Sequence, residues 1–443
     1  PGNTQENFAA TIDWGDGTSE PVSDITLTEI AGKEGVLTRG SVQANHAYGD
    51  DGFYTVVLRV SDDDGGVGES RLKVTVANVR PVLSALADHS APEGSFIHLS
   101  SVAFSDPGFD HPPAGTQENF TATVDWGDGT SEPVADIAVL ETPGREGTAT
   151  TGILQAQHAY GDNGTYTANV CISDDDFGKD CKNFKVTVNN VAPALASLPD
   201  KITDEGSFIE LPPSSFTDPG FDNPLGGTKE DFTATVDWGD GTSEPVSDIT
   251  LVETPGNEGK LTQGSLQAKH AYADDGTYSV VVALKDDDGG QDVKSFKVAV
   301  NNVAPALALL PDQVSDEGSF IQLPPGSFTD PGFGNPDGGT SENFSATIDW
   351  GDGTTEPTLD ITLVETPGAE GKQTQGTIQA KHAYGDNGLY TTTACVYDDD
   401  LGKDCKSFKV TVNNVAPVVA AGLDQITNEG TFIHLAPATF TDT

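Results

Sequence analysis

The sequence predicts an all-β chain in which antiparallel β-sandwich domains follow one another as an elongated rod. The first observation is a repeat of 112 residues, which carries a tryptophan and a histidine through every copy, at Trp14, Trp126, Trp238 and Trp350 and at His46, His158, His270 and His382. A unit of that length is large enough to close its own hydrophobic core. The second observation is the composition, because 35% hydrophobic residues with 50 glycines and 27 prolines suit short strands joined by many turns.

The domain boundaries are predicted at a recurring segment, "NNVAP", in which proline ends a strand and fixes the chain between two sandwiches. It occurs at 189–193, 301–305 and 413–417, with the variant "NVRP" at 78–81. We therefore expect three whole domains at 81–192, 193–304 and 305–416, a front fragment at 1–80 that lacks its first strands, and a tail at 417–443.

The two fragments are predicted to be complementary. The tail carries the first strands of a sandwich, and the front fragment begins inside the loop that follows such strands. Joined, they make a further sandwich five residues short of a full repeat, so we hypothesise that the chain is one period of a head-to-tail polymer of itself. The link is either covalent, in a longer chain of the same repeats, or non-covalent, with the tail of one molecule completing the front domain of the next. With no Met and no secretory signal, the sequence is expected to be a window from a longer protein.

The strands are predicted from alternation. In 53–60 the residues Tyr54, Val56, Leu58 and Val60 share one face, which is the pattern of a strand with one buried side. Similar runs, such as "FTATVDW" and "SFKVAVNN", predict seven to nine strands in each unit. A tryptophan late in a central strand and a "DxGxY" motif that is typical of a tyrosine corner indicate an immunoglobulin-like sandwich.

Four ordered motifs, "DWGDGT", "HAYxDxGxY", "DDDGG" and "VTVNNVAP", resemble the PKD (polycystic kidney disease) domain, a β-sandwich of bacterial surface and secreted proteins. The resemblance covers every repeat and implies an extracellular or cell-surface spacer or adhesive role without catalysis. The units depart from the family in 247–269, which we interpret as an added hairpin.

The function is expected to be that of a non-catalytic structural segment in a surface fibre, filament or giant adhesin. A net charge of −47 excludes nucleic acid as a partner, because binding it requires a basic surface. No apolar run of 18 residues is present for a membrane span, and no "GxSxG" elbow or unrepeated polar cluster suggests an enzyme. The alternative is a stalk that binds a polysaccharide, a surface glycan or another cell-surface ligand.

The four cysteines form two pairs ten residues apart, Cys171 with Cys181 and Cys395 with Cys405, around an Asp-rich loop. The equivalent positions hold Arg59 with Glu69 in the front fragment and an Ala with a Val in 193–304. Each combination is a sensible cross-strand match. We therefore predict two disulfides, which persist in an oxidising compartment.

The acidic loops predict calcium at the pole of each domain nearest the linker. Carboxylates with Asn side chains on Gly-containing loops are the hard oxygen ligands that Ca²⁺ prefers, and neighbouring acidic poles would otherwise repel one another. The "DWGDG" turn is a weaker candidate, and a solvated acidic surface is the alternative to any calcium site. The expected ligands are Asp62, Asp63, Asp64, Asp106, Asp174, Asp175, Asp176, Asn190, Asp218, Asp286, Asp287, Asp288, Asn302, Asp330, Asp398, Asp399, Asp400 and Asn414.

Overall fold

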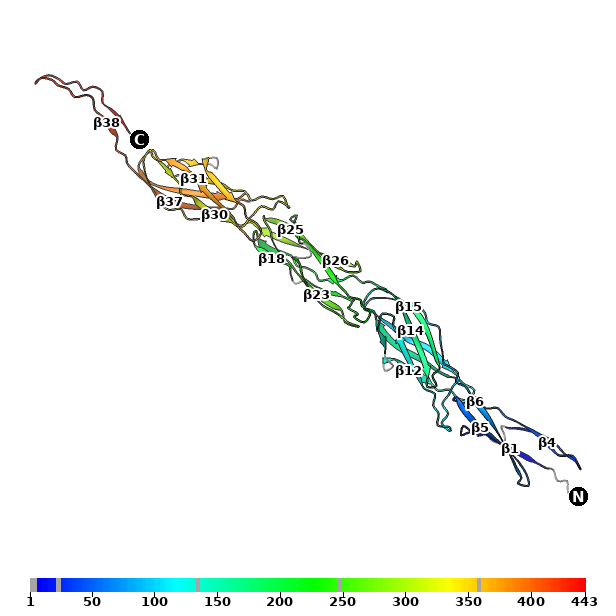
Figure 1. Cartoon of the computed structure of the whole chain (residues 1–443). Coiled ribbons are helices and arrows are strands. Elements are labelled where there is room, and N and C mark those ends of the chain that lie inside the picture. Colours follow the sequence, from blue (N-terminus) through cyan, green and yellow to red (C-terminus); the bar gives the residue numbers. More distant parts are fainter. Residues whose placement is uncertain (1–5, 21–24, 133–135, 213, 245–247, 357–359) are drawn as a thin grey trace.

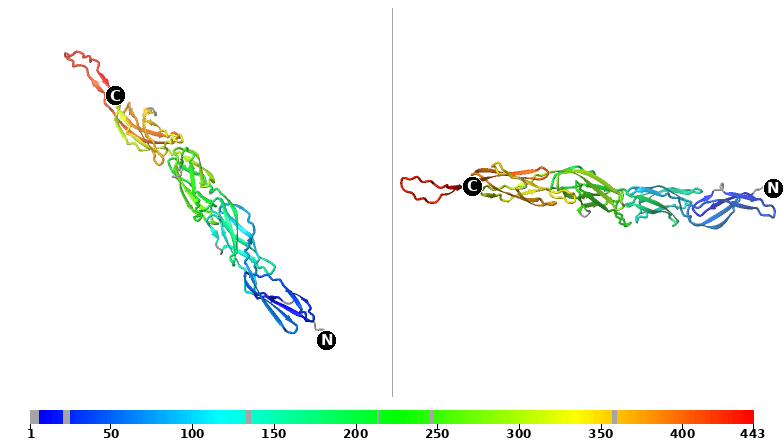
Figure 2. Two further views of the ribbon diagram at one scale, coloured as in Figure 1. Left: turned by 45° about the vertical axis from the view of Figure 1, so that its right-hand side comes forward. Right: turned by 90° about the horizontal axis from the view of Figure 1, so that it is seen from above.

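The computed structural model describes residues 6–20, 25–132, 136–212, 214–244, 248–356 and 360–443, so the first five residues of the front fragment lie outside the described residues. The chain forms an elongated rod of successive β-sandwich units, with its two ends at opposite ends of the rod (Figures 1 and 2). We call 6–80 the front unit, 81–192, 193–304 and 305–416 the second, third and fourth units, and 417–443 the tail. The described residues contain no helix long and apolar enough to cross a membrane.

The third unit shows the complete topology of a sandwich. One sheet has the strand order β16-β19-β23-β22 and the other has β17-β26-β25-β20-β21, with β17 parallel to β26 and a short β18–β24 pair beside them. This is the immunoglobulin-like arrangement predicted from the alternation. Its strands are β16 (Ala194–Leu195), β17 (Lys201–Asp204), β18 (Phe208–Glu210), β19 (Ser214–Asp218), β20 (Phe232–Asp237), β21 (Ser243–Glu244), β22 (Thr250–Thr254), β23 (Thr262–Gln267), β24 (Lys269–Ala271), β25 (Gly276–Asp286) and β26 (Gln291–Asn301).

The second and fourth units repeat this topology, except that in the second unit β9 and β13 are each one continuous strand where the later units have two. The strands of the second unit are β7 (Val82–Leu83), β8 (His89–Pro92), β9 (Phe96–Asp106), β10 (Phe120–Asp125), β11 (Ser131–Glu132), β12 (Ala138–Thr142), β13 (Thr150–Ala159), β14 (Gly164–Asp174) and β15 (Lys179–Asn189). Those of the fourth are β27 (Ala306–Leu307), β28 (Gln313–Asp316), β29 (Phe320–Gln322), β30 (Gly326–Asp330), β31 (Ser345–Asp349), β32 (Thr355–Glu356), β33 (Thr362–Thr366), β34 (Thr374–Gln379), β35 (Lys381–Ala383), β36 (Gly388–Tyr397) and β37 (Lys403–Asn413).

The front unit and the tail each contain part of a sandwich. The front unit has the sheet β2-β1-β5-β6 and the separate hairpin β3–β4, and the tail has the pair β38–β39, which projects from the far end of the rod (Figure 1). Their strands are β1 (Phe8–Asp13), β2 (Ser19–Glu20), β3 (Thr26–Ile30), β4 (Arg39–Gln43), β5 (Gly52–Asp62), β6 (Val67–Val76), β38 (Val418–Ala420) and β39 (Thr439–Thr441).

Each complete unit has its own core around the repeated tryptophan. Trp126, Trp238 and Trp350 are fully buried between the two sheets, whose inward-facing residues alternate with exposed ones along each strand. The tyrosine corner is confirmed in the second, third and fourth units. The hydroxyl groups of Tyr166, Tyr278 and Tyr390 each donate to the backbone oxygen four residues upstream, at 2.8 to 3.0 Å. This bond fixes the start of β14, β25 or β36 against the preceding turn.

The interpretation of 247–269 as an added hairpin is wrong. Residues 250–267 form β22 and β23, and β23 pairs with β19 along Ser214–Asp218, so the hairpin completes one of the two sheets. Its outer strand β22 is mostly exposed, with Leu251 packed against the core. An edge strand of this kind carries little apolar alternation, which is why the sequence suggested an excursion from the sandwich.

The predicted cross-strand pairs are confirmed. Cys171 lies opposite Cys181 on β14 and β15, and Cys395 lies opposite Cys405 on β36 and β37; both pairs are disulfide-bonded. In the front unit the same pair of positions holds Arg59 and Glu69, whose side chains form a salt bridge at 3.1 Å. The third unit places an alanine opposite a valine there.

Reduction should therefore destabilise two of the three complete units. A disulfide that closes so short a loop contributes roughly 3 kcal/mol to the free energy of unfolding. We expect a reductant to lower the melting temperatures of the second and fourth units in calorimetry of the whole chain. The third unit is the internal control, because Ala283 and Val293 occupy the pair there, and an equal shift of all transitions would contradict the assignment.

Candidate metal centre at the domain junctions

The junction between the third and fourth units gathers acidic side chains from both. From the third unit come Glu205, in the turn after β17, and Asp274, in the turn before β25. The linker adds Asn302. The turn that carries Glu205 lies directly on the fourth unit, since a Cβ atom on Gly206 would be 2.3 Å from the backbone oxygen of Pro331. Gly206 also has a φ of +66°, so glycine is required at this contact for two reasons.

The fourth unit contributes its own acidic groups to the same place. Asp330 ends β30, Glu342 lies in the loop before β31, and 398–400 form the turn between β36 and β37. Short hydrogen bonds fix one oxygen of each of two aspartates: Gly332 N–H donates to Asp330 Oδ1 at 2.7 Å, and Gly402 N–H donates to Asp398 Oδ1 at 2.6 Å. The other oxygen of each carboxylate is buried without a hydrogen-bond partner.

The carboxylates lie close enough to share an ion. One oxygen from each of Glu205, Asp274 and Asp400 lies within 4.8 Å of the others. Calcium binds oxygens at about 2.4 Å, so two oxygens on one ion can be at most about 4.8 Å apart. The three groups come from both sides of the junction, so an ion held there would tie the third unit to the fourth.

Buried oxygens without a partner are the second observation that indicates a cation. At this junction the atoms Glu205 Oε2, Asn302 Oδ1, Asp330 Oδ2, Glu342 Oε1 and Asp398 Oδ2 are buried and make no hydrogen bond. Glu205 and Asp330 are only 2% and 0% exposed. A buried carboxylate oxygen that lacks a partner carries a large free-energy cost, and oxygen ligands of this kind are what Ca²⁺ coordinates in sets of six to eight.

The pKa values of the junction carboxylates are raised for the same reason. Burial, together with the charges of neighbouring aspartates, raises the pKa of Glu205 to about 8 and the pKa of Glu342 to about 9. Burial and the charges at 398–400 raise the pKa of Asp330 to about 6. Without a cation, Glu205 and Glu342 reduce the repulsion at the junction by retaining protons at neutral pH.

The junction between the second and third units has the same construction. Glu93 is 1% exposed and accepts from Val191 N–H at 2.7 Å through one oxygen, while its other oxygen is buried without a partner. Oxygens of Glu93, Glu230 and Asp288 lie within 4.8 Å of one another. Burial raises the pKa of Glu93 to about 8 and that of Glu230 to about 9. The arrangement is therefore a repeated feature of the rod.

The junction between the front and second units is a partial version. A cavity there is lined by acidic and amide side chains that include Asp50, Asp51, Asn78, Asp106, Glu118 and Asp176. Burial raises the pKa of Glu118 to about 8. The counterpart of Glu93 and Glu205 would precede residue 1, so it is not among the residues that the structure describes.

Two further contacts hold the third and fourth units together. The glutamate at the tip of the β33–β34 hairpin reaches back to the third unit, where Glu370 accepts from Ala271 N–H at 2.8 Å and lies 3.5 Å from the ring of His270. The loop before β31 also reaches back, and Asn335 donates to the backbone oxygen of Asp240 at 3.0 Å. Glu146 and Glu258 make the same hairpin contact at the two earlier junctions.

The "DWGDG" turn has a structural role. In the third unit, Asp240 accepts from Thr242 and lies 2.8 Å from the ring nitrogen of His270, which stacks on Trp238. These bonds hold the pKa of Asp240 below its usual value, even though burial opposes them. The carboxylate is therefore already satisfied, and it supports the surface on which the next unit rests.

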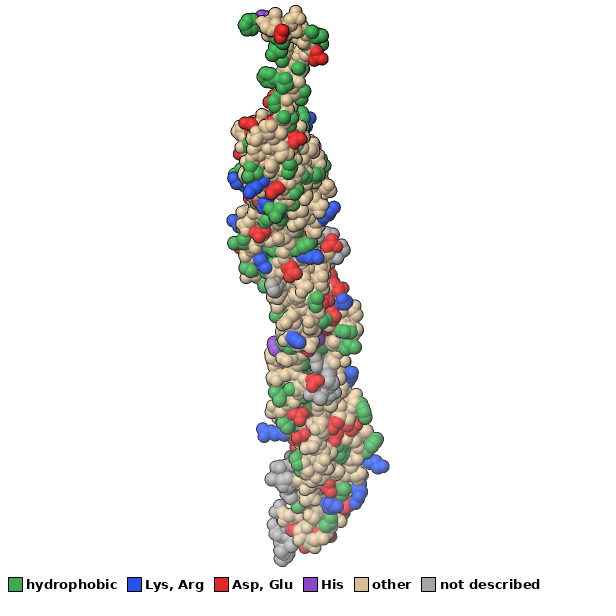
Figure 3. All heavy atoms as spheres, turned by 90° about the vertical axis from the view of Figure 1, so that its left-hand side faces the viewer, with side chains coloured by type: hydrophobic (Ala, Val, Ile, Leu, Met, Phe, Trp, Pro, Cys, Tyr) green, Lys and Arg blue, Asp and Glu red, His purple; other side chains and the backbone are tan. Residues whose placement is uncertain are grey.

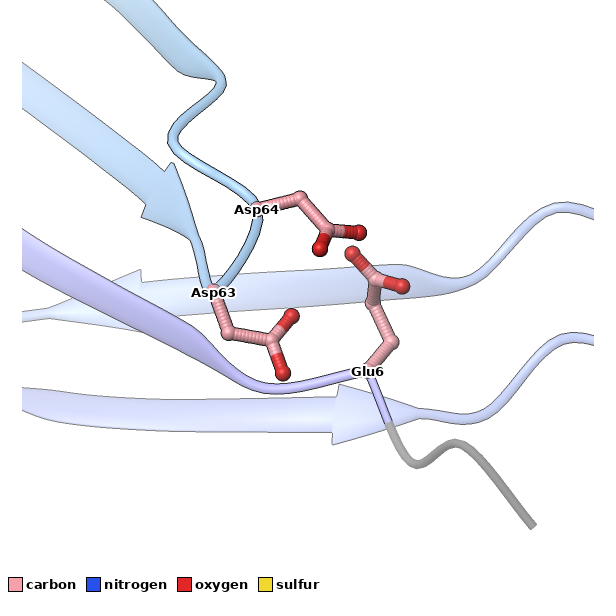
Figure 4. A group of neighbouring side chains, drawn as sticks. All are labelled: Glu6, Asp63 and Asp64. Carbon is pink, nitrogen blue, oxygen red and sulfur yellow. The ribbon is translucent and has the colours of Figure 1, made fainter. Parts of the chain in front are cut away.

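Some of the predicted calcium ligands lie at the junctions between units and others do not. The structure brings those of the second, third and fourth units to the junctions, together with the linker residues Asn190 and Asn302. Asp63 and Asp64 lie with Glu6 in an exposed group at the end of the front unit (Figure 4), and Asn414 is exposed directly after β37, at the end of the fourth unit. The calcium ligands expected from the sequence do not include the glutamates that the neighbouring units contribute to the junctions, which are Glu93, Glu118, Glu205, Glu230 and Glu342.

The fold and the junctions can be compared with known proteins. No protein-family model matches the chain, and no curated protein does. The titin I-band fragment I67–I69 is 14% identical with a TM-score of 0.27, over 77% of this chain and 100% of the fragment. The human desmocollin-1 ectodomain is 11% identical with a TM-score of 0.23, over 94% and 78%. Sidekick-1 immunoglobulin domains 1–5 are 14% identical with a TM-score of 0.27, over 92% and 74%.

These likenesses carry no argument about this chain, because the TM-scores are low. The fold rests instead on the strand order of each complete unit. The chain is a tandem array of immunoglobulin-like sandwiches. Its two disulfides are those of a protein from an oxidising compartment.

The junction carboxylates make the stability of the metal-free rod depend on pH. Their folded pKa values, about 8 for Glu205 and about 9 for Glu342, lie above the ordinary value of 4.5. The folded state therefore holds more protons between these values, and stability is lost as pH rises from about 4.5 to 9. In a chelator, we expect the melting temperature to be higher at pH 5 than at pH 8.5. Calcium should remove or reverse that difference, and a chelated protein that is more stable at pH 8.5 would contradict this account.

Proposed function

We propose that the chain is a calcium-stiffened, non-catalytic segment of an extracellular surface fibre or adhesin. The observation that carries the proposal is the set of buried oxygens without partners at the junctions, contributed by both neighbouring units and by the linker. Neutralising them with a divalent cation stabilises the contact between units. A rod whose junctions are locked holds whatever it carries at a fixed distance from the cell.

The charge distribution supports the same function. The chain has 69 acidic against 22 basic residues, and a substantial part of that excess meets at the junctions. Without a cation, like charges on facing poles favour bending or separation of the units. With calcium, the hairpin contact and the Asn contact can hold each unit in one orientation.

We propose further that the units are PKD-like domains of a bacterial surface protein. The support is the order of the four motifs and their positions in the sandwich: "DWGDG", which contains the tryptophan, begins at the last residue of a central strand, "HAY" precedes the tyrosine corner, "DDDGG" forms the last turn of the sheet, and "VTVNNVAP" ends the last strand and continues into the linker. These motifs lie in regions that form or support a junction, which suits a spacer more than a catalytic domain.

The test is calcium binding by the whole chain, measured by calorimetric titration and by thermal melting with and without a chelator. We expect binding at the junctions and a clear rise in melting temperature, since a ligand at a hundred times its Kd adds about 2.7 kcal/mol to stability. Glu205→Gln and Glu342→Gln should each weaken binding at one junction. Glu210→Gln is the matched control, because Glu210 is exposed on β18 of the same unit.

X-ray scattering should show the mechanical consequence. The chain should be straighter and less variable in its longest dimension with calcium than with chelator. A melting temperature and a scattering profile that do not respond to calcium would overturn the proposal.

A further inference from the structure

At the junction between the front and second units, two groups of carboxylates share one residue. Oxygens of Asp50, Asp51 and Asp176 lie within 4.8 Å of one another, and so do oxygens of Glu118, Asp175 and Asp176. The first group, which we call the coupling group, takes its residues from both neighbouring units. The second, which we call the inner group, takes all of its residues from the second unit. Asp176 belongs to both.

The same groups can be followed along the rod. At each junction the coupling group contains the third aspartate of a "DDD" turn, which is Asp176, Asp288 or Asp400. The front unit has an inner group of its own, formed by Glu6 with Asp63 and Asp64 (Figure 4). Since an inner group comes from a single unit, it forms without a contribution from a neighbour.

Buried oxygens without a partner accompany the inner group in the second, third and fourth units. Asp106, Asp218 and Asp330 end a strand there, are at most 2% exposed, and each has one carboxylate oxygen that makes no hydrogen bond. Figure 3 shows other acidic side chains scattered over one face of the rod, where water can solvate them. The buried aspartates lack that solvation, so they indicate a cation where surface carboxylates alone do not.

A glycine brings the buried aspartate and the glutamate of the inner group together. A Cβ atom on Gly332 would lie 2.5 Å from Glu342 Oε2 and 3.0 Å from Asp330 Oδ1, so both carboxylates pack against the same glycine. In the second and third units, the glycine two residues after the buried aspartate has the same neighbours. A side chain at this position would push the glutamate away. The fold thus holds two acidic groups together although their charges repel one another.

The shared aspartate is affected by charges on both of its sides. Burial raises the pKa of Asp400 to about 6, together with the charges of Asp274 from the third unit and Asp399 from its own unit. The pKa values of Asp176 and Asp288 are raised to about 6 by burial and by the charges of both adjoining units. A carboxylate placed between two acidic groups in this way can bridge two ions, because each of its oxygens can bind one.

A single ion would leave most of the charge at a junction uncompensated. The junction between the third and fourth units contains the carboxylates of Glu205, Asp274, Asp330, Glu342 and the aspartates 398–400. A divalent cation neutralises the charge of two carboxylates. It also coordinates six to eight oxygens when it is Ca²⁺, so these side chains offer more oxygens than one ion binds.

We infer that each junction holds two divalent cations, one in the inner group and one in the coupling group, bridged by the shared aspartate. The inference rests on the proposed function, since it specifies how many ions a junction binds and in which order. The inner site fills first, because its ligands belong to one unit and are already held in place: Asn343 N–H, for example, donates to Asp399 Oδ1 at 3.2 Å. The coupling site fills second, because it also requires the two units to be correctly oriented.

Lanthanide ions test this arrangement in the whole, unmodified chain. Tb³⁺ and Eu³⁺ bind oxygen ligands as Ca²⁺ does, and energy transfer from Tb³⁺ to Eu³⁺ requires two ions close together. Ions in a two-metal site lie about 3.5–4 Å apart, whereas ions at different junctions are separated by a whole unit. We expect strong transfer when a mixture of the two lanthanides saturates the chain. Transfer should be weak when few ions are bound, because the inner sites then fill alone.

Two substitutions at one junction test the bridge. At a calcium concentration that saturates the unmodified chain, Glu205→Gln should remove about one bound ion, since it alters only the coupling group. Asp400→Asn should remove about two, because both ions depend on that carboxylate. Glu210→Gln, exposed on β18 of the same unit, is the matched control and should remove none. Calorimetric titration of the whole chain counts the ions.

The outcomes separate this inference from the proposed function. Calcium and lanthanide binding without energy transfer, or the loss of one ion in both variants, would overturn the two-ion arrangement and leave the calcium-stiffened rod in place. A chain that binds neither calcium nor lanthanides would overturn both. The energy-transfer measurement needs no substitution, so it decides the question even if Asp400→Asn does not fold.

Discussion

Each junction depends on carboxylates that the fold buries without partners. Turns from one unit and turns from the next close over the same space, and the backbone bonds that fix Glu205 and Asp330 satisfy only one oxygen of each. The protein has two ways to relieve this: it can retain protons, which the raised pKa values describe, or it can hold a cation. Only the second also attracts the two units to each other at neutral pH.

The surrounding contacts are consistent with a junction that has one geometry. The β33–β34 hairpin extends past the limit of its own sandwich and places Glu370 on the third unit, while Asn335 reaches the turn that holds Asp240. These hydrogen bonds are directional and lie on either side of the acidic cluster. They specify the orientation in which the carboxylates meet, so that neutralising the charge would produce a straight rod and not merely a tighter contact.

Much of this could be predicted from the sequence, because it depends on local patterns repeated four times. The buried tryptophans, the tyrosine corner at Tyr278 and the cross-strand position of Cys171 follow from alternation and spacing. The role of Glu342 could not be predicted, because it lies in an irregular loop where no periodicity marks it. The place of the β22–β23 hairpin in the sheet is not evident from the sequence, because its outer strand β22 lies at an exposed edge and shows little apolar alternation. The contact of Glu205 with the next unit is set by domain orientation, which no local pattern encodes.

The same bonds that position the junction carboxylates also leave them available. Glu205 accepts from Val303 N–H through one oxygen, and its other oxygen is buried without a partner. Asp330 is held in the same way by Gly332 N–H. The fold and not an ion therefore sets where these groups lie. A cation that neutralises them would find its oxygen ligands already placed, so binding would not have to pay for ordering the loops that carry them.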